Sequence, residues 1–147
     1  MKIKLDTIKG EGLGTHLRPY EATALNEVWD AQYPIGSGAV WQILKDKGIK
    51  TNPDARNTVS RASVIFFLND LVDEGILNWN DATGKGGHHR LYYPKVSREK
   101  YPKYVVEQVM EALKRTFPED PLIKKIIDIV TVTLPPSTPN ESTESIT

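Results

Sequence analysis

The sequence has no cysteine among its 147 residues, which removes two ways of holding a small fold together. Neither disulfide bridges nor cysteine-ligated zinc can form, and this favours a reducing compartment. Long apolar runs are missing as well: nowhere do 18 consecutive apolar residues occur, so no membrane-spanning helix is expected. The first residues, MKIKLDTIKGEGLG, contain no apolar stretch typical of a signal peptide. We therefore expect a cytoplasmic protein without a membrane partner.

An excess of charge of either sign is also absent, because 19 basic residues balance 19 acidic ones. A net charge of zero argues against a strongly basic nucleic-acid binder. The distribution is uneven, however: from Lys85 to Lys103 there are six basic residues, one acidic residue and two histidines. The positive charge therefore gathers in one part of the chain, around the stretch TGKGGHHRLYY (residues 83–93).

Three segments between Pro19 and Gly75 repeat apolar residues at the spacing i, i+3, i+4, which predicts three helices with one buried face each. Pro19 suits the first turn of the first helix, and Ser37 suits the cap of the second. Gly48 and Gly75 end the second and third helices. The three tryptophans are interpreted as core residues. The predicted faces are Leu25, Val28 and Trp29; Val40, Ile43 and Leu44; and Val64, Phe67, Leu68, Leu71 and Val72. The other two tryptophans are Trp41 and Trp79.

A β-hairpin follows the third helix. The segments ILNWN and HHRLYY alternate between apolar and polar residues, and DATGKGG between them is turn-forming. The alternation places Leu91 and Tyr93 on the face that packs on the core, and Arg90 and Tyr92 on the other. Pro94 ends the pairing.

The C-terminal third is predicted to be helical up to a polar tail. A fourth helix starts at Pro102 and ends before Pro118, and PLIKKIIDIV then has helical spacing, although its β-branched residues also allow a strand. We expect an N-terminal arm or short strand at 1–18, a helix-and-hairpin domain at 19–96, a helical segment at 97–134 and a disordered tail at 135–147. The apolar stripe of the fourth helix is Val106, Val109, Met110, Leu113 and Phe117.

Three helices followed by a hairpin within about 75 residues are the order of a winged helix-turn-helix, in which the third helix enters the major groove of DNA and the hairpin reaches the backbone or minor groove. The expected fold class is thus mainly α with a small β-hairpin. Residues 19–94 resemble the winged-helix domain of the penicillinase-repressor and methicillin-resistance-repressor family of transcriptional regulators. The segments that carry the resemblance are ALNEVWDA, SRASVIFFLNDLVDEGIL and LYYP.

The resemblance implies a repressor that binds double-stranded DNA as a homodimer, with the C-terminal helices as the dimer contact. The same apolar stripe can instead fold back on the first domain as part of a monomer core. The expected DNA contacts on the third helix are Asn57, Thr58, Ser60, Arg61, Ser63 and Asn69. Those on the hairpin and just beyond it are Lys85, His88, His89, Arg90 and Lys95.

One surface departs from this family pattern. The outward face of the third helix carries Ala62 and Phe66, with Ile65 alongside, where such repressors have polar or basic residues for base readout. Ala62 and Phe66 can meet thymine methyl groups but cannot read guanine. The end of the helix is acidic, with Asp70, Asp73 and Glu74, and would be repelled by phosphate. A protein-interaction module that uses Ile65 and Phe66 is therefore the competing hypothesis.

Other functions of the stretch TGKGGHHRLYY are less well supported. A nucleotide-binding P-loop needs a Ser or Thr directly after its lysine and a helix next, whereas Lys85 is followed by glycine and a strand. His88 and His89 are adjacent on a strand and point to opposite faces, so they do not chelate one metal ion. No catalytic signature is present. We expect no metal, no cofactor and no enzymatic activity, and a solvated hairpin without a partner is the plainest alternative.

Overall fold

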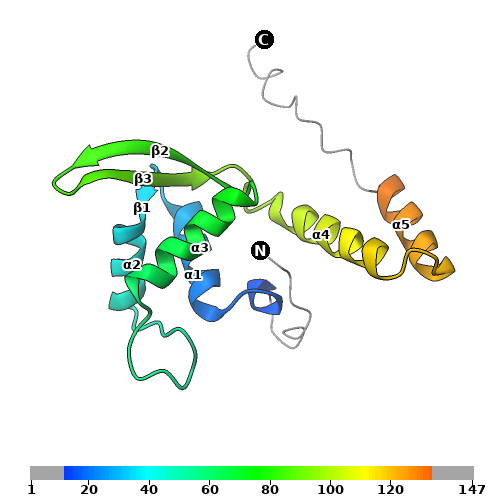
Figure 1. Ribbon diagram of the computed structural model, residues 1–147, viewed down its shortest axis with the longest axis horizontal. Helices are drawn as coiled ribbons and strands as arrows, with labels where there is room; N and C mark the ends of the chain where they lie inside the picture. The colour runs from blue at the N-terminus through cyan, green and yellow to red at the C-terminus, as the bar shows by residue number, and fades with distance from the viewer. Residues whose placement is uncertain (1–11, 134–147) are drawn as a thin grey trace, which may run out of the picture. The chain divides into compact units, whose positions relative to one another are not determined.

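The computed structural model describes residues 12–133, which form five α-helices and a small three-stranded antiparallel sheet (Figure 1). The chain divides into two compact units, one up to Tyr101 and one from Pro102. Mixed helix and hairpin structure is thus confirmed. Of the arm or short strand expected at 1–18, residues 1–11 lie outside the described residues, as does the tail expected at 135–147, and Gly12–Thr15 form a 3-10 turn. No described helix combines the length and apolarity needed to cross a bilayer.

The first unit is built on three helices, after a short 3-10 turn, η2 (Gly12–Thr15). They are α1 (Pro19–Asp30), α2 (Ser37–Asp46) and α3 (Arg61–Asp73). As predicted, Pro19 is the first residue of α1, and Gly48 follows α2 with a φ of 67°. The predicted cap of α2 is wrong by one position: Ser37 is already helical, and Gly36 is the N-cap, without a side chain to accept a hydrogen bond.

The sheet has the order β1-β3-β2, so the second arm of the hairpin is the central strand. Its members are β1 (Ile35–Gly36), β2 (Leu77–Gly84) and β3 (Gly87–Pro94). Gly84 pairs with Gly87 across a two-residue turn, and Gly87 has a φ of 90° that other residues rarely adopt. The predicted hairpin is therefore confirmed. Sequence reasoning missed β1, because two residues are too few to show a period.

The core lies where the three helices meet the base of the hairpin. The predicted helix faces supply most of it, while Trp29, Ile43 and Val72 are only half-buried. The hairpin was assigned the wrong inward residue: Tyr92 is buried, whereas Leu91 and Tyr93 are half-buried. Trp79 was also wrongly interpreted as a core residue, since 36% of it is exposed. The fully buried large side chains are Leu25, Val28, Val40, Leu44, Val59, Val64, Leu68, Leu71, Ile76 and Leu77.

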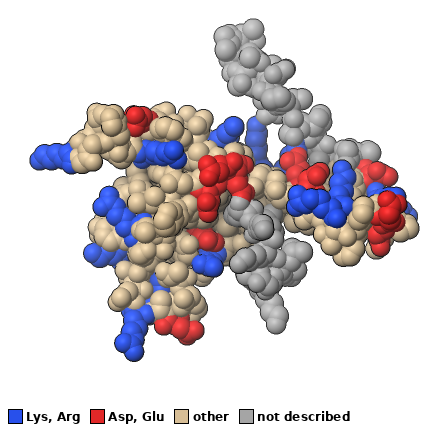
Figure 2. All heavy atoms as spheres, viewed as in Figure 1, with Lys and Arg blue, Asp and Glu red and all other residues tan. Residues whose placement is uncertain are grey.

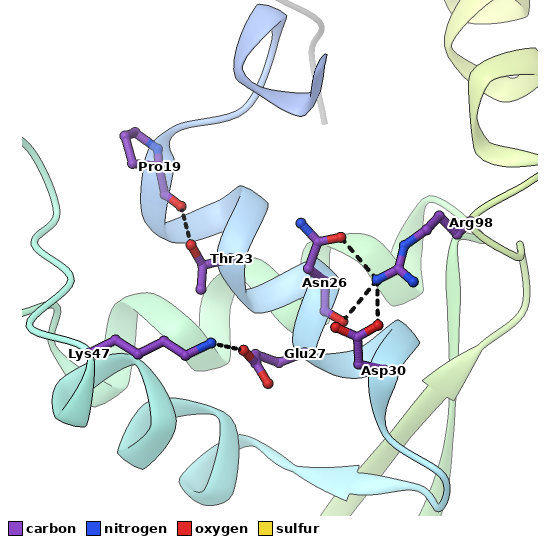
Figure 3. Close-up of polar contacts among 7 residues, drawn as sticks. All are labelled: Pro19, Thr23, Asn26, Glu27, Asp30, Lys47 and Arg98. Carbon is purple, nitrogen blue, oxygen red and sulfur yellow. Dashed lines mark hydrogen bonds and ion pairs between the residues drawn. The ribbon is translucent and has the colours of Figure 1, made fainter. Parts of the chain in front are cut away.

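Polar contacts tie the chain segments of the first unit to α1. The indole N–H of Trp29 donates to the carbonyl of Val96. Arg98 donates to the carboxylate of Asp30 at 2.7 Å, as Figure 3 shows. Both contacts hold the segment after β3 against α1. On the other side, Lys47 after α2 forms an ion pair with Glu27 of α1. Exposed ion pairs of this kind each contribute about 0–1 kcal/mol, so the apolar core remains the main source of stability.

The second unit consists of two amphipathic helices, α4 (Tyr101–Thr116), whose first residue belongs to the first unit, and α5 (Pro121–Thr133). The segment PLIKKIIDIV is thus a helix and not a strand. None of residues 102–130, whose side chains the structure describes, is buried. The predicted stripe of α4 is half-exposed, and its last member, Phe117, lies just beyond the end of the helix. Within the described part of the second unit, this apolar face is therefore not fully covered.

A histidine at the edge of the core predicts how stability depends on pH. The Nε2 atom of His16 lies 2.7 Å from the hydroxyl of Tyr101, and burial lowers the pKa of His16 from its usual 6.5, against a smaller opposing effect of Glu21. The unfolded chain therefore takes up a proton near pH 6.5, and the folded chain only at lower pH. Because the unfolded state binds more protons in that window, the free energy of unfolding falls as the pH drops below about 6.5.

We expect the melting temperature, measured by circular dichroism, to decrease from pH 7.5 to pH 5, and the variant His16→Gln to show a smaller decrease. The two proteins differ only at residue 16, so the difference between the two profiles isolates His16. Parallel profiles would contradict the assignment.

Candidate functional site

The first turn of α3 presents one cation to solvent. Ser60 is the N-cap: its Oγ atom accepts from the backbone N–H of Ser63 at 3.1 Å and lies 2.9 Å from the Ser63 hydroxyl. These two predicted DNA-contacting residues are therefore engaged with each other, and the cap stabilises the helix by about 1 kcal/mol. Arg61, the first helical residue, is exposed. Of the three, Arg61 is the side chain that remains available.

Two of the predicted recognition-helix residues precede α3. Asn57 is exposed in the loop before the helix, and Thr58 pairs with Lys50 in an isolated antiparallel bridge. Their placement on the helix was wrong, because Ser60 terminates the preceding extended segment and the helix begins only at Arg61. Trp41 holds this loop to α2 by donating its indole N–H to the carbonyl of Val59 at 3.0 Å.

The outward face of α3 changes character along its length. Ala62 and Phe66 are exposed, Phe66 at 69%, while the last turn and the residue after it carry Asp70, Asp73 and Glu74. Figure 2 shows red spheres gathered where α3 ends in Figure 1. A polyanion would meet the start of this helix favourably and be repelled by its end.

Asn69 joins α3 to the hairpin. Its side-chain oxygen accepts from the Tyr92 hydroxyl at 2.7 Å and from Nη1 of Arg90 at 3.0 Å. Burial raises the pKa of Tyr92, against a smaller lowering by Arg90, so the phenol stays protonated and donates. The Arg90 guanidinium also lies over the Trp79 ring, 4.3 Å from its centroid. The structure thus gives Asn69 and Arg90, both predicted DNA contacts, an internal role that fixes the angle of the hairpin.

The two histidines of the hairpin lie on opposite faces of the sheet, as their adjacent positions require. His88 pairs with Thr83 in the register and its Nδ1 atom lies 3.4 Å from the carboxylate of Asp81. His89 pairs with Ala82, and its ring lies over Gly84. Within residues 12–133 no three His, Asp or Glu side chains form a group that could hold a metal ion.

An open pocket of about 490 Å³ lies between the starts of α2 and α3 and the end of the hairpin. It brings together three of the predicted side chains, Arg61, Lys85 and His89. Figure 2 shows blue spheres at the free end of the hairpin. Lys95 is exposed beyond β3 and does not line this pocket. Sequence reasoning missed the contribution of α2, although the small residues Gly36, Ser37 and Gly38 at its start leave room for a close approach.

Comparison with known protein families and with curated proteins finds no match for this chain.

The contacts of Asn69 predict a measurable coupling between α3 and the hairpin. Asn69→Ala leaves the Tyr92 hydroxyl without its acceptor, which costs about 1–3 kcal/mol, whereas removing the hydroxyl as well removes most of that cost. In urea unfolding we expect Asn69→Ala to be less destabilising in a Tyr92→Phe background than in the wild type. Additive effects of the two substitutions would show that the hydrogen bond contributes nothing to stability.

Proposed function

We propose that the protein binds double-stranded DNA as a transcriptional regulator, with the first unit acting as a winged helix-turn-helix. In this arrangement α3 enters the major groove and the β2–β3 hairpin lies on the backbone or in the minor groove. The observation that carries the proposal is the position of Arg61 and Lys85. These cations come from α3 and from the hairpin turn, yet they line one pocket on one side of the unit.

The charge along α3 supports one orientation on DNA. The cation at its start and the carboxylates at its end favour insertion of the N-terminal half, with the acidic end held away from phosphate. Within that half, the exposed Ala62 and Phe66 are suited to the methyl group of thymine. Sequence preference would then come from apolar contacts more than from hydrogen bonds.

Rigid support from Asn69 is consistent with this use of the hairpin. A recognition helix and a wing must keep a fixed distance to meet two grooves or a groove and the backbone. Asn69, Arg90 and Tyr92 supply such a link between α3 and β3. We therefore assign Arg90 to positioning, and Lys85 with His89 to contact with phosphate.

We also propose that the second unit forms a homodimer through the apolar face of α4. This face carries apolar residues at helical spacing, and none of them is buried within the described part of the second unit: Val106, Val109, Met110 and Leu113. A two-fold dimer would present two copies of α3 to half-sites about one turn of DNA, roughly 34–36 Å, apart. Repression by blocking polymerase follows from the family resemblance of residues 19–94.

The exposure of Phe66, at 69%, favours a second candidate function, docking of a partner protein on α3. Together with the half-buried Ile65 beside it, Phe66 forms a small apolar contact surface. Carboxylates lie next to this surface, whereas a DNA-binding surface is expected to carry cations throughout. Such a module would not bind duplexes. The two candidates therefore differ in one simple measurement.

Binding to a fluorescent random-sequence duplex, followed by anisotropy, tests DNA binding directly. Because each phosphate contact releases counterions, an interface with six or more contacts should lose at least about 10³-fold in affinity between 50 and 200 mM salt. Lys85→Ala should weaken binding to all sequences and make the salt dependence less steep. Lys125→Ala, on α5 in the second unit, is a matched surface change that removes the same charge and should have no such effect. Absence of binding at 50 mM salt would leave the protein-docking candidate.

The dimer is tested by placing charge on α4. Leu113→Glu puts a carboxylate in the apolar face and should shift the protein from dimer to monomer in sedimentation equilibrium, since an unpaired buried charge is costly. Gln108→Glu adds the same charge at an exposed position outside the stripe and should leave the dimer intact. A wild-type protein that sediments as a monomer would contradict the proposal.

A further inference from the structure

The pocket beside the hairpin turn is lined by basic side chains from two separate parts of the chain. Arg61 comes from the start of α3, Lys85 from the turn, and His89 from the adjoining end of β3. No Asp or Glu is among the residues that line it. In a chain with equal numbers of acidic and basic residues, such a one-sided pocket is a local feature and does not follow from the composition.

The basic side chains of this pocket have no acidic partner among residues 12–133. Across residues 12–133, Arg61, Lys85 and His89 form no side-chain hydrogen bond or ion pair, whereas the neighbouring His88 has Asp81 and Arg90 has Asn69. Like charges that are held together without a counter-charge repel one another. An anion that enters the pocket would relieve this repulsion.

The shape of the pocket is set by glycine. The guanidinium of Arg61 lies over Gly38 so closely that a Cβ atom at this position would stand 3.1 Å from its Nη2 atom. A methyl group on Gly38 would therefore shift the guanidinium by a few tenths of an ångström. The start of α2 lines the same wall, and its N-cap, Gly36, offers no side-chain acceptor to the first amide groups. The site is defined by the three side chains, and the first backbone amides of α2 are further N–H donors on the same wall.

We propose that this pocket binds one phosphate group. Arginine presents planar paired donors that fit two phosphate oxygens, lysine supplies a point charge, and the imidazole supplies a further N–H. The phosphate can belong to a DNA backbone or to a small soluble phosphate compound, and the chemistry at the site is the same. Where the source is DNA, the inference rests on the proposed function and identifies where a backbone phosphate sits between α3 and the hairpin.

Inorganic phosphate is the probe for the soluble source. Titrated into the full-length, ¹⁵N-labelled protein at constant ionic strength against chloride, it should shift the amide resonances of Gly38, Arg61 and Gly86 more than those of α4. Two variants, Arg61→Gln and Lys85→Gln, are measured with phosphate in this way and with a duplex by anisotropy. Each should weaken binding by about tenfold, the usual effect of losing one charge-assisted hydrogen bond.

Gly38→Ala is the sharper variant, because it retains every charge and changes only the space around Arg61. Alanine is favourable within a helix, so the fold should be kept, which the melting temperature checks. We expect weaker phosphate or duplex binding than in the wild type. Lys125→Gln is the control: it removes an exposed cation of α5, which is in the second unit and outside the pocket, and should change binding by less than twofold.

The outcomes separate the two proposals. Phosphate binding that Arg61→Gln, Lys85→Gln and Gly38→Ala weaken supports the pocket even if no duplex binds, and DNA binding would then be wrong. Duplex binding that these variants weaken more than Lys125→Gln supports the pocket with DNA as the source, whether or not free phosphate binds. The pocket proposal is overturned if neither probe binds, or if the three variants behave like Lys125→Gln with every probe that binds.

Discussion

The buried hydroxyl of Tyr92 is the constraint around which the first unit is arranged. Tyr92 lies on the face of β3, the central strand, that packs against α3, and because it is buried its hydroxyl needs a partner away from water. Asn69 of α3 supplies the acceptor at 2.7 Å. The same oxygen also accepts from Arg90, which lies over Trp79. A single amide oxygen thereby fixes the helix, the central strand and the base of the projecting hairpin relative to one another.

This arrangement separates supporting residues from exposed ones on the same elements. On β3, Arg90 and Tyr92 face α3, whereas His89 and Leu91 belong to the opposite face and line the pocket. On α3, Asn69 lies against the sheet, whereas Ala62 and Phe66 are exposed. Two-residue periodicity on the strand and 3.6-residue periodicity on the helix are sufficient to produce this division. Whether a polar residue of α3 or β3 supports the fold or is exposed to a ligand therefore depends on the face on which it lies and not on its residue type.

The sequence predicts the parts of this fold that repeat over many residues. The helix faces built on Leu25, Val40 and Val64 are confirmed, as is the turn before Gly87, because hydrophobic period and glycine position act locally. The inward face of β3 was wrongly assigned, since Leu91, Tyr92 and Tyr93 are all apolar enough to be buried and only the helix opposite decides among them. The strand β1 was missed because its two residues pair with β3 from 55 or more positions away.

The candidate site was predictable only in part for the same reason. Positive charge around Lys85 is visible in the sequence, but its proximity to Arg61 depends on how the hairpin lies against the helices. The internal roles of Asn69 and Ser60 also depend on partners that their types do not specify. Side chains able to bind an external ligand and side chains that hold the fold together are thus drawn from the same residue types.

The charges of α3 run against its own peptide dipoles. A helix is stabilised by acids in its first turn and bases in its last, yet α3 has an arginine in its first turn, no acid there and no base in its last turn. Each exposed charge placed this way costs about 0.3–1 kcal/mol at low ionic strength. On its own, α3 is therefore less stable than a helix of the same composition with these charges exchanged between its ends. Because salt screens the unfavourable interactions, added salt should stabilise α3. A negatively charged group next to the start of α3 would offset these unfavourable interactions between charges and peptide dipoles.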